Sequence, residues 1–159
     1  IDNVIPFIGG EEEKLEIEPQ KIFGTVRDGR IEAVELLVSA HVHRVPVSDG
    51  HTLALSAAFD RAVTPEQAES WMREFRAEPQ SRSLPSAPDP AIVVLNEPDR
   101  PQPRLDRMAG GGMAVVVSKL RVCPVLGLKF EVLSHNTVRG AAGGTILIAE
   151  LLKAEGLLS

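Results

Sequence analysis

Residues 113–134 read MAVVVSKLRVCPVLGLKFEVLS, and this stretch decides the fold class. Residues 113–122 and 128–134 are rich in β-branched and apolar side chains, which favours two strands. Pro124 and Gly127 interrupt the run between them, as a turn would. Because one predicted strand follows another without a crossover helix, a mainly antiparallel sheet is favoured over a doubly wound parallel one.

More strands are predicted on the N-terminal side of this stretch. Residues 31–47 are dense in valine and leucine, and residues 51–59 read HTLALSAAF. Between them, residues 48–50 read Ser-Asp-Gly, and Asp-Gly tolerates the positive φ of a hairpin turn. Residues 91–95, AIVVL, form a further short strand. We therefore expect an α+β fold with a mixed, mainly antiparallel sheet.

Three helices are predicted around these strands. Residues 10–24 place apolar side chains on one helical face, with Pro19 expected to kink or restart the helix and Gly24 to end it. Residues 64–75 begin Thr-Pro-Glu, which supplies an N-cap, a proline at the first position and an acid in the first turn. The last helix is expected over residues 136–155.

The remaining segments are predicted to be loops. Residues 79–90 contain four prolines and three serines, which indicates an exposed loop, and residues 97–107 are rich in proline and arginine. Two glycine clusters, at 110–112 and 140–144, lack the spacing of a phosphate-binding loop. If the protein uses a nucleotide, most of the site for it is expected to lie outside this sequence.

Composition limits the function further. With 159 residues, 43% of them hydrophobic, the chain can build one domain with a sizeable core. The net charge of −5 argues against bulk attraction to nucleic acid. The sequence contains no run of 18 apolar residues, the length that a membrane-spanning helix would need. One cysteine excludes a disulfide framework and a multi-cysteine metal site, and fits a reducing compartment. Because the chain begins with Ile, we expect it to be a piece of something longer.

Arg44 and His51 flank the predicted turn at 48–50 and form one candidate site. An arginine offers a planar fork for a carboxylate, and a histidine can exchange protons near neutral pH. A surface hairpin with a solvated arginine is the simpler interpretation. Glu11 and Lys14 are neighbours on a predicted helix and could bind an ammonium group and an anion. A solvated acidic first turn would equally suit the helix dipole.

Asn136 lies where the last strand ends and the last helix begins, and it could hydrogen-bond a ligand amide or only cap the helix. His135, His41 and His43 are further candidates. His41 and His43 share one face of a predicted strand, but no third metal ligand is obvious. Cys123 precedes a proline at a turn, with nothing in VCPVLG expected to lower its pKa. A packing role is therefore predicted for this cysteine.

Three motifs together resemble the aspartate-semialdehyde dehydrogenases of the archaeal and fungal branch: NVIPFIGGEEEK at 3–14, HRVPVSDGHT at 43–52 and VLSHNTVRGAAGGTILIAELL at 132–152. The motifs occur in the family's order. The resemblance implies that residues 1–159 are the C-terminal catalytic and dimerisation domain of a larger enzyme. This domain would resemble that of glyceraldehyde-phosphate dehydrogenases, with helices on one sheet face and a second subunit on the other.

The resemblance also implies roles for individual residues. His51 matches the acid/base histidine, and Arg44 the arginine that binds the substrate carboxylate. Glu11 matches the carboxylate that holds the substrate ammonium, and Lys14 the lysine near the phosphate site. Asn136 matches the position on the nicotinamide side of NADP. The cysteine nucleophile has no counterpart here and would precede residue 1. The resemblance also implies an N-terminal NADP-binding Rossmann domain that is absent from this sequence.

The family's activity is the reversible, NADP-dependent reductive dephosphorylation of aspartyl 4-phosphate to aspartate 4-semialdehyde. It serves lysine, methionine and threonine biosynthesis, and a cytoplasmic homodimer or dimer of dimers is expected. The fragment alone is expected to be inactive, with no nucleic-acid or membrane partner. Two alternatives remain open at this stage: a non-catalytic metabolite-binding domain and a purely structural dimerisation module.

Overall fold

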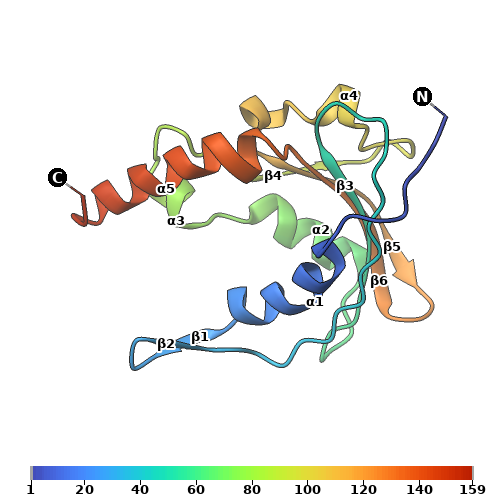
Figure 1. The fold of residues 1–159 in the computed structure, drawn as a ribbon, viewed down its shortest axis with the longest axis horizontal. Helices are drawn as coiled ribbons and strands as arrows, with labels where there is room; N and C mark the ends of the chain where they lie inside the picture. The colour runs from blue at the N-terminus through green and yellow to red at the C-terminus, as the bar shows by residue number, and fades with distance from the viewer. Residues whose placement is uncertain (1, 159) are drawn as a thin grey trace. The chain divides into compact units, whose positions relative to one another are not determined.

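The computed structural model describes residues 2–158 and divides after Val47 into two compact units. The N-terminal unit holds one helix and a two-stranded sheet. The C-terminal unit holds a four-stranded mixed sheet with the other helices (Figure 1). The predicted α+β class is confirmed.

Helix α1 of the N-terminal unit spans Glu11–Ile22 and begins with three glutamates, whose charge is favourable at a helix N-terminus. It is a single helix through Pro19, so the predicted restart there is wrong. The turn after the proline remains bonded, because the N–H of Phe23 donates to the Pro19 carbonyl at 2.9 Å. Gly24 follows the helix for a steric reason: a Cβ there would lie 2.4 Å from the carbonyl oxygen of Glu32.

A small hairpin follows α1. Strands β1, Thr25–Arg27, and β2, Arg30–Glu32, pair in antiparallel fashion. Asp28 and Gly29 both have positive φ in the turn between them, as tight hairpin turns require. All six strand residues are exposed, so this hairpin contributes little core.

The strand predicted over residues 31–47 is largely wrong. After β2 the backbone has no regular structure until Arg44, which forms an isolated antiparallel bridge with Ile5. The N–H groups of Ala40 and Val42 donate instead to carboxylates of α1, at 3.0 Å each. The β-branched side chains do favour extended backbone, but a strand also needs a row of partner backbone groups, which α1 does not offer.

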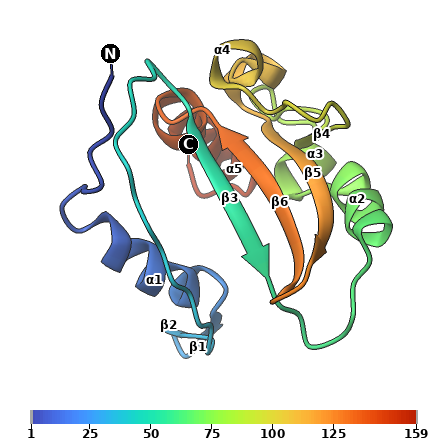
Figure 2. The ribbon, with the colours of Figure 1, turned by 90° about the vertical axis from the view of Figure 1, so that its right-hand side faces the viewer.

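The C-terminal unit is built on one sheet of order β3-β6-β5-β4 (Figure 2). Strand β4 is parallel to β5 and the other pairs are antiparallel. The side chains of Leu128 and Leu133 on β6 are completely buried and mark the centre of the core. The strands predicted within 51–59, 91–95, 113–122 and 128–134 are confirmed, as β3, His51–Ala57; β4, Ile92–Leu95; β5, Val115–Cys123; and β6, Gly127–Ser134.

The hairpin predicted at residues 48–50 is wrong, because β3 pairs with β6. Leu53 lies opposite Val132 and Leu55 opposite Phe130, so the apolar side chains of β3 meet those of β6. Such cross-strand apolar pairs stabilise a sheet more than a short turn sequence can. Long-range pairing therefore overrides the local Asp-Gly signal.

Helix α2, Pro65–Glu74, confirms its predicted start and end. Thr64 is the N-cap and exchanges hydrogen bonds with Gln67 in a capping box. The helix packs on β4 and β5, and Ala68 is its buried residue. It lies on the sheet face that α5 also covers, as the expected one-sided arrangement requires (Figure 2).

The last helix is confirmed only in part. A π-helical turn, Val138–Ala142, precedes α5, Gly143–Ala154, and Gly156 ends it with a φ of 74°. The wide turn brings the carbonyl oxygen of Arg139 within 2.4 Å of where a Cβ on Gly144 would lie. The small residues therefore serve a close approach within the chain.

The two predicted loops contain short helices. Residues 79–90 overlap α3, Glu78–Ser81, and Gln80 is buried with its Nε2 donating to the carbonyl of Pro88 at 3.0 Å. The prediction of an exposed loop is wrong at these two residues. Residues 97–107 include one helical turn, α4, Pro103–Asp106.

Candidate active site

His51 is the first residue of β3, at one edge of the sheet. Its register partner is Ser134, the last residue of β6. The His51 side chain is exposed, and its ring makes no hydrogen bond with any residue that the structure describes. The backbone alone therefore positions the His51 ring, at the end of the β3–β6 strand pair.

The residue before His51 has to be a glycine. Gly50 has a φ of 107°, in the range that L-amino acids rarely adopt. A Cβ at this position would also lie 3.1 Å from Leu133 Cδ1 and 3.4 Å from Pro103 Cβ. The peptide that leads into His51 is consequently both conformationally special and closely surrounded.

Residues 49 and 50 form the turn before His51, and side chains that follow β6 hydrogen-bond to it. The N–H of Gly50 donates to Asn136 Oδ1 at 2.8 Å, across 86 residues of sequence. The hydroxyl of Thr137 lies 3.3 Å from Asp49 Oδ1 and donates to it. The structure thus brings together two of the five predicted site residues, His51 and Asn136.

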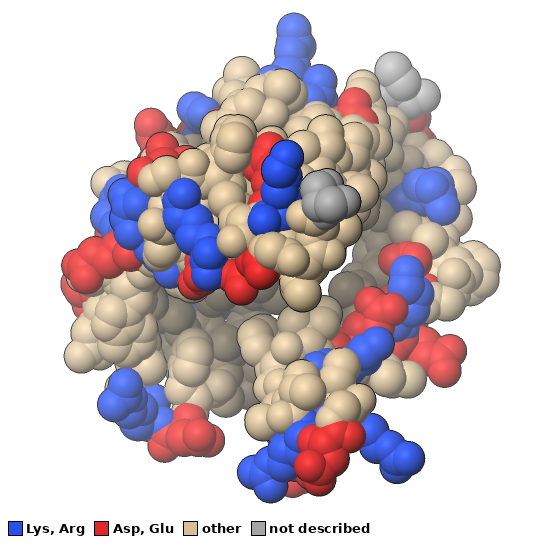
Figure 3. All heavy atoms as spheres, turned by 90° about the vertical axis from the view of Figure 1, so that its left-hand side faces the viewer, with Lys and Arg blue, Asp and Glu red and all other residues tan. Residues whose placement is uncertain are grey.

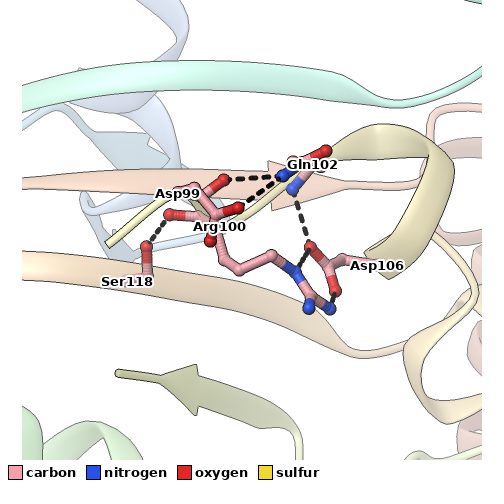
Figure 4. Close-up of polar contacts among 5 residues, drawn as sticks. All are labelled: Asp99, Arg100, Gln102, Asp106 and Ser118. Carbon is pink, nitrogen blue, oxygen red and sulfur yellow. Dashed lines mark hydrogen bonds and ion pairs between the residues drawn. The ribbon is translucent and has the colours of Figure 1, made fainter. Parts of the chain in front are cut away.

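Helix α4 lies against the same turn. The Arg107 guanidinium donates to the carbonyl of Asp49 at 3.5 Å. Helix α4 is itself tied to the sheet through Arg100, whose guanidinium binds both carboxylate oxygens of Asp106 and whose carbonyl accepts from the hydroxyl of Ser118 (Figure 4). The backbone N–H of Gln102 donates to the Asp106 carboxylate at 2.6 Å.

This network fixes the charge of Asp106, whose side chain is 5% exposed. The hydrogen bonds from Arg100 lower the pKa of the Asp106 carboxyl below its ordinary value of 3.8, against the opposing effect of burial, and the N–H of Gln102 lowers it further. The same pair raises the pKa of the Arg100 guanidinium. The pair therefore remains ionised at neutral pH and anchors α4 beside the turn.

His135 is buried and has a structural role. Its Nδ1 accepts from the backbone N–H of Val138 at 3.4 Å and lies 3.3 Å from Thr137 Oγ1. A Cβ on Gly112 would lie 3.2 Å from the His135 ring. This histidine packs behind the Asn136 segment and is not available as an exposed acid/base group.

Glu11 and Lys14 lie in the first turn of α1, in the N-terminal unit. Lys14 Nζ lies 3.1 Å from Glu11 Oε1, and the two side chains are 55% and 39% exposed. The hydrogen bond to Glu11 raises the pKa of Lys14. The pair is thus a solvated ion pair whose members can exchange partners, and an exposed pair of this kind contributes little to stability.

Arg44 is the other predicted site residue of the N-terminal unit. Its backbone is fixed, because its N–H donates to the Ile5 carbonyl at 2.8 Å and its carbonyl accepts from the Ile5 N–H at 3.1 Å. Its side chain is exposed, and within residues 2–158 its guanidinium is bonded to no other side chain. The planar fork is therefore available to a ligand.

Cys123 departs from its sequence prediction in one respect. The N–H groups of Leu126 and Val125 lower the pKa of the Cys123 thiol, so the expectation that nothing near it would do so is wrong. Cys123 is 7% exposed as a residue, and its sulfur accepts from the Leu126 N–H at 3.5 Å and lies 3.8 Å from Ser56 Oγ. Burial at the end of β5 fits the predicted packing role.

Three other features would bear on function: a metal site, a membrane-spanning helix and a patch of one charge. Within the described part of the chain, no group of three or more His, Cys, Asp or Glu side chains is arranged to hold a metal ion. His41 and His43 lie in the irregular segment after β2, so the strand face that they were predicted to share is absent. Residues 2–158 contain no helix long and apolar enough to cross a membrane. Acidic and basic side chains are intermixed on the side drawn in Figure 3.

Two cavities lie in the C-terminal unit, away from His51. One of about 520 Å³ lies between α5 and the segment after α2, with Arg139 and Gln80 among its lining residues. The other, of about 210 Å³, is lined by apolar side chains of α2 and the sheet, including Trp71 and Phe130. None of the five predicted site residues lines either cavity.

Sequence reasoning missed Thr137 and Arg107 beside the His51 turn, and it missed the contact that the predicted residue Asn136 makes there. Asp49-Gly50 did indicate a turn, but its partners Asn136 and Thr137 come from the far end of β6. Arg107 gave no signal, because it lies in a segment predicted to be loop. The register of β3 with β6 brings Asn136 and Thr137 to this turn, and Arg107 reaches it from the end of α4.

The family described as "Semialdehyde dehydrogenase, dimerisation domain" matches residues 1–139. The chain belongs to this family. The resemblance predicted from the three motifs is confirmed.

Individual relatives agree with this assignment to the family. Aspartate-semialdehyde dehydrogenase from Archaeoglobus fulgidus is 50% identical over 157 residues, which are 99% of this chain and 45% of the relative. The crystal structure of the Candida albicans enzyme with NADP has a TM-score of 0.93 and 44% identity, covering 99% of this chain and 46% of that one. A Vibrio cholerae aspartate semialdehyde dehydrogenase II complexed with ASA has a TM-score of 0.74 and 27% identity, covering 96% and 41%.

The chain therefore spans less than half the length of the relatives it matches. Both the archaeal and the fungal branch occur among them. The structural likeness at a TM-score of 0.93 covers both units and confirms the fold class that the resemblance implied.

Proposed function

We propose that residues 1–159 are the catalytic and dimerisation part of an NADP-dependent aspartate-semialdehyde dehydrogenase. The reaction is the reversible reductive dephosphorylation of aspartyl 4-phosphate to aspartate 4-semialdehyde, in lysine, methionine and threonine biosynthesis. The observation that carries the proposal is the Gly50–Asn136 hydrogen bond, which joins the His51 and Asn136 motifs in a chain of this family. The relatives named for this activity support it.

His51 serves as the proton carrier in this proposal. It accepts the proton of the nucleophilic cysteine thiol, which belongs to the part of the enzyme that precedes residue 1, and returns a proton to the substrate oxygen. A histidine suits this task because its ordinary pKa lies near neutral pH. Its exposed ring at the end of β3 leaves it free to meet both partners.

The charged groups of the N-terminal unit bind substrate. Arg44 receives the α-carboxylate in its planar fork, as a bidentate pair favours. Glu11 holds the substrate ammonium and Lys14 lies at the phosphate. Because Glu11 and Lys14 already bind one another at 3.1 Å, substrate binding exchanges one solvated ion pair for two contacts with the ligand.

The described residues fit only one end of NADP. Asn136 uses its Oδ1 for Gly50, and its Nδ2 has no hydrogen-bond partner among residues 2–158, so the amide can still donate to the nicotinamide side. The pyrophosphate would need a glycine-rich loop from a Rossmann domain, which the sequence does not contain. When bound, the cofactor supplies or accepts the hydride.

Dimerisation is proposed through the sheet face opposite α2. Ala54 alternates with Leu53 and Leu55, which share a face with Phe130 beside α2, so Ala54 and its partner Glu131 lie on the other face. We expect a cytoplasmic homodimer or dimer of dimers. Sedimentation velocity of the intact enzyme at micromolar concentration tests this: Ala54→Arg should produce monomers, whereas Ala62→Arg, in an exposed loop, should not.

The decisive experiment is an activity assay on the intact polypeptide that contains residues 1–159. Consumption of NADPH should depend on aspartyl phosphate, and the reverse reaction on phosphate and aspartate semialdehyde. Residues 1–159 alone should neither turn over substrate nor bind NADP tightly in calorimetry. An intact enzyme with neither activity would favour a non-catalytic metabolite-binding or dimerisation module instead.

A further inference from the structure

The peptide that leads into His51 has polar contacts to which the proposed chemistry assigns no role. From their arrangement we infer that Asn136 is a positioning residue, which acts through its Oδ1 on the Gly50 peptide to hold the His51 ring in place. This inference rests on the proposed function of His51. It gives Asn136 a role in proton transfer that is separate from any contact with the cofactor.

The position of the His51 ring depends on support from outside β3. It is the first residue of β3, and β3 is the edge strand that pairs only with β6 in the order β3-β6-β5-β4. The ends of edge strands open most readily, because few backbone bonds must break. The His51 ring has no bonded partner among the described residues, so movement of the backbone would move the ring.

Asn136 supplies this support. The Gly50 N–H, one peptide before the strand begins, donates to Asn136 Oδ1 at 2.8 Å, a good length for such a bond. A backbone N–H has to meet an oxygen, so the bond also settles which end of the Asn136 amide faces the turn. Thr137 and Arg107 bind Asp49 at the longer distances of 3.3 and 3.5 Å.

The turn before His51 has little room to shift. Gly50 has a φ of 107°, and a Cβ there would lie 3.1 Å from Leu133 Cδ1 and in van der Waals contact with Pro103 and Arg107. The turn is therefore confined between β6 and α4, and Asn136 makes its shortest polar contact. Loss of that oxygen leaves the Gly50 N–H without its partner and permits the strand end to open.

The two ends of the Asn136 amide thus have separable effects. Loss of Oδ1 should lower kcat by misplacing His51, whereas loss of Nδ2 should raise KM for NADP. Asn136→Ala removes both groups. Asn136→Asp keeps an oxygen acceptor for Gly50 and removes the donor, so it should recover most of the kcat that Asn136→Ala loses while its KM for NADP stays raised.

The test uses steady-state kinetics of the intact enzyme. Asn136→Ala should lower kcat about 10- to 100-fold, the effect of a small misplacement of a reacting group. In a His51→Gln background the same substitution should lower kcat no further, because it acts through His51. Asn96→Ala is the matched control, since the Asn96 side chain only accepts a 3.4 Å bond from Arg73 at the surface.

The outcomes divide cleanly. An unchanged kcat in Asn136→Ala, a kcat in Asn136→Asp no better than in Asn136→Ala, or a full further loss in the His51→Gln background would each overturn the inference. An equal loss in Asn96→Ala would do so as well. Failure of the proposed function is a different result, namely a wild-type enzyme without the activity. Hydrogen exchange of ¹⁵N-labelled Gly50, faster in Asn136→Ala than in wild type, reports the same contact independently of turnover.

Discussion

The two units of the molecule differ in how tightly they hold their candidate site residues. In the C-terminal unit, the turn before His51 is confined by a 2.8 Å hydrogen bond, a left-handed glycine and a neighbouring helix. In the N-terminal unit, Glu11 and Lys14 are solvated and Arg44 is held only by its backbone. A proton carrier benefits from a fixed position, whereas groups that bind a charged substrate can adapt to it. The contrast suggests that substitutions in the two units should affect different kinetic constants.

The largest effect is expected at the confined turn. His51→Gln keeps a hydrogen-bonding side chain but cannot carry a proton, and kcat of the intact enzyme should fall by about 10²- to 10⁴-fold. KM for the substrate should change far less, because Arg44 and Glu11 remain. Steady-state kinetics with varied aspartyl phosphate measures both constants. A large rise in KM with an unchanged kcat would break the contrast between the units.

In the N-terminal unit we expect a smaller effect, and we expect it on KM and not on kcat. Arg44→Leu removes the carboxylate fork, so KM for aspartyl phosphate should rise about 10- to 100-fold, as the loss of a charged hydrogen bond implies. Arg30→Leu, on the exposed strand β2, is the control that removes a positive charge elsewhere in the unit. If both variants raise KM equally, Arg44 has no specific contact with the carboxylate.

The stabilisation by the Arg100–Asp106 ion pair, which anchors α4 beside the turn, should depend on pH. The depressed pKa of the Asp106 carboxyl means that its stabilisation is complete above its ordinary value of 3.8 and is lost as the pH falls through the lower folded value. Asp106→Asn should therefore cost about 1–2 kcal/mol of unfolding free energy at pH 7, and the difference from wild type should shrink below about pH 4. Urea unfolding at several pH values measures this. A difference that grows on acidification would contradict the assigned ion pair.

The same contrast explains what could be predicted from the sequence. Strands β4, β5 and β6 and the start of α2 follow from local composition and capping residues, and the structure confirms them. The strand expected over 31–47 and the hairpin at 48–50 failed because each depends on a partner. The partner of β3 is β6, and no local pattern names it.

The candidate site divides along the same line. The resemblance identified His51, Asn136, Arg44, Glu11 and Lys14 from motifs, and their roles remain predictions. The Gly50–Asn136 bond could not be foreseen, because it joins residues 86 positions apart through the register of the sheet. Asp106 gave no signal either, since a buried ion pair within a predicted loop looks like any charged loop residue.

The smallest effect is expected at Cys123, which lies outside both sets of candidate residues. Its thiol has a lowered pKa because the N–H groups of Leu126 and Val125 face the sulfur, and a lowered pKa alone would suggest a reactive nucleophile. Cys123 is nonetheless only 7% exposed as a residue and lies at the far end of β5, where its sulfur has Leu126 and Ser56 as polar partners. A serine there can accept the Leu126 N–H in the same way. Cys123→Ser should therefore keep kcat of the intact enzyme within about twofold of wild type, as expected for a small packing residue. Loss of turnover in Cys123→Ser, with His51→Gln active, would mean that the assignment of the active site to the confined turn is wrong.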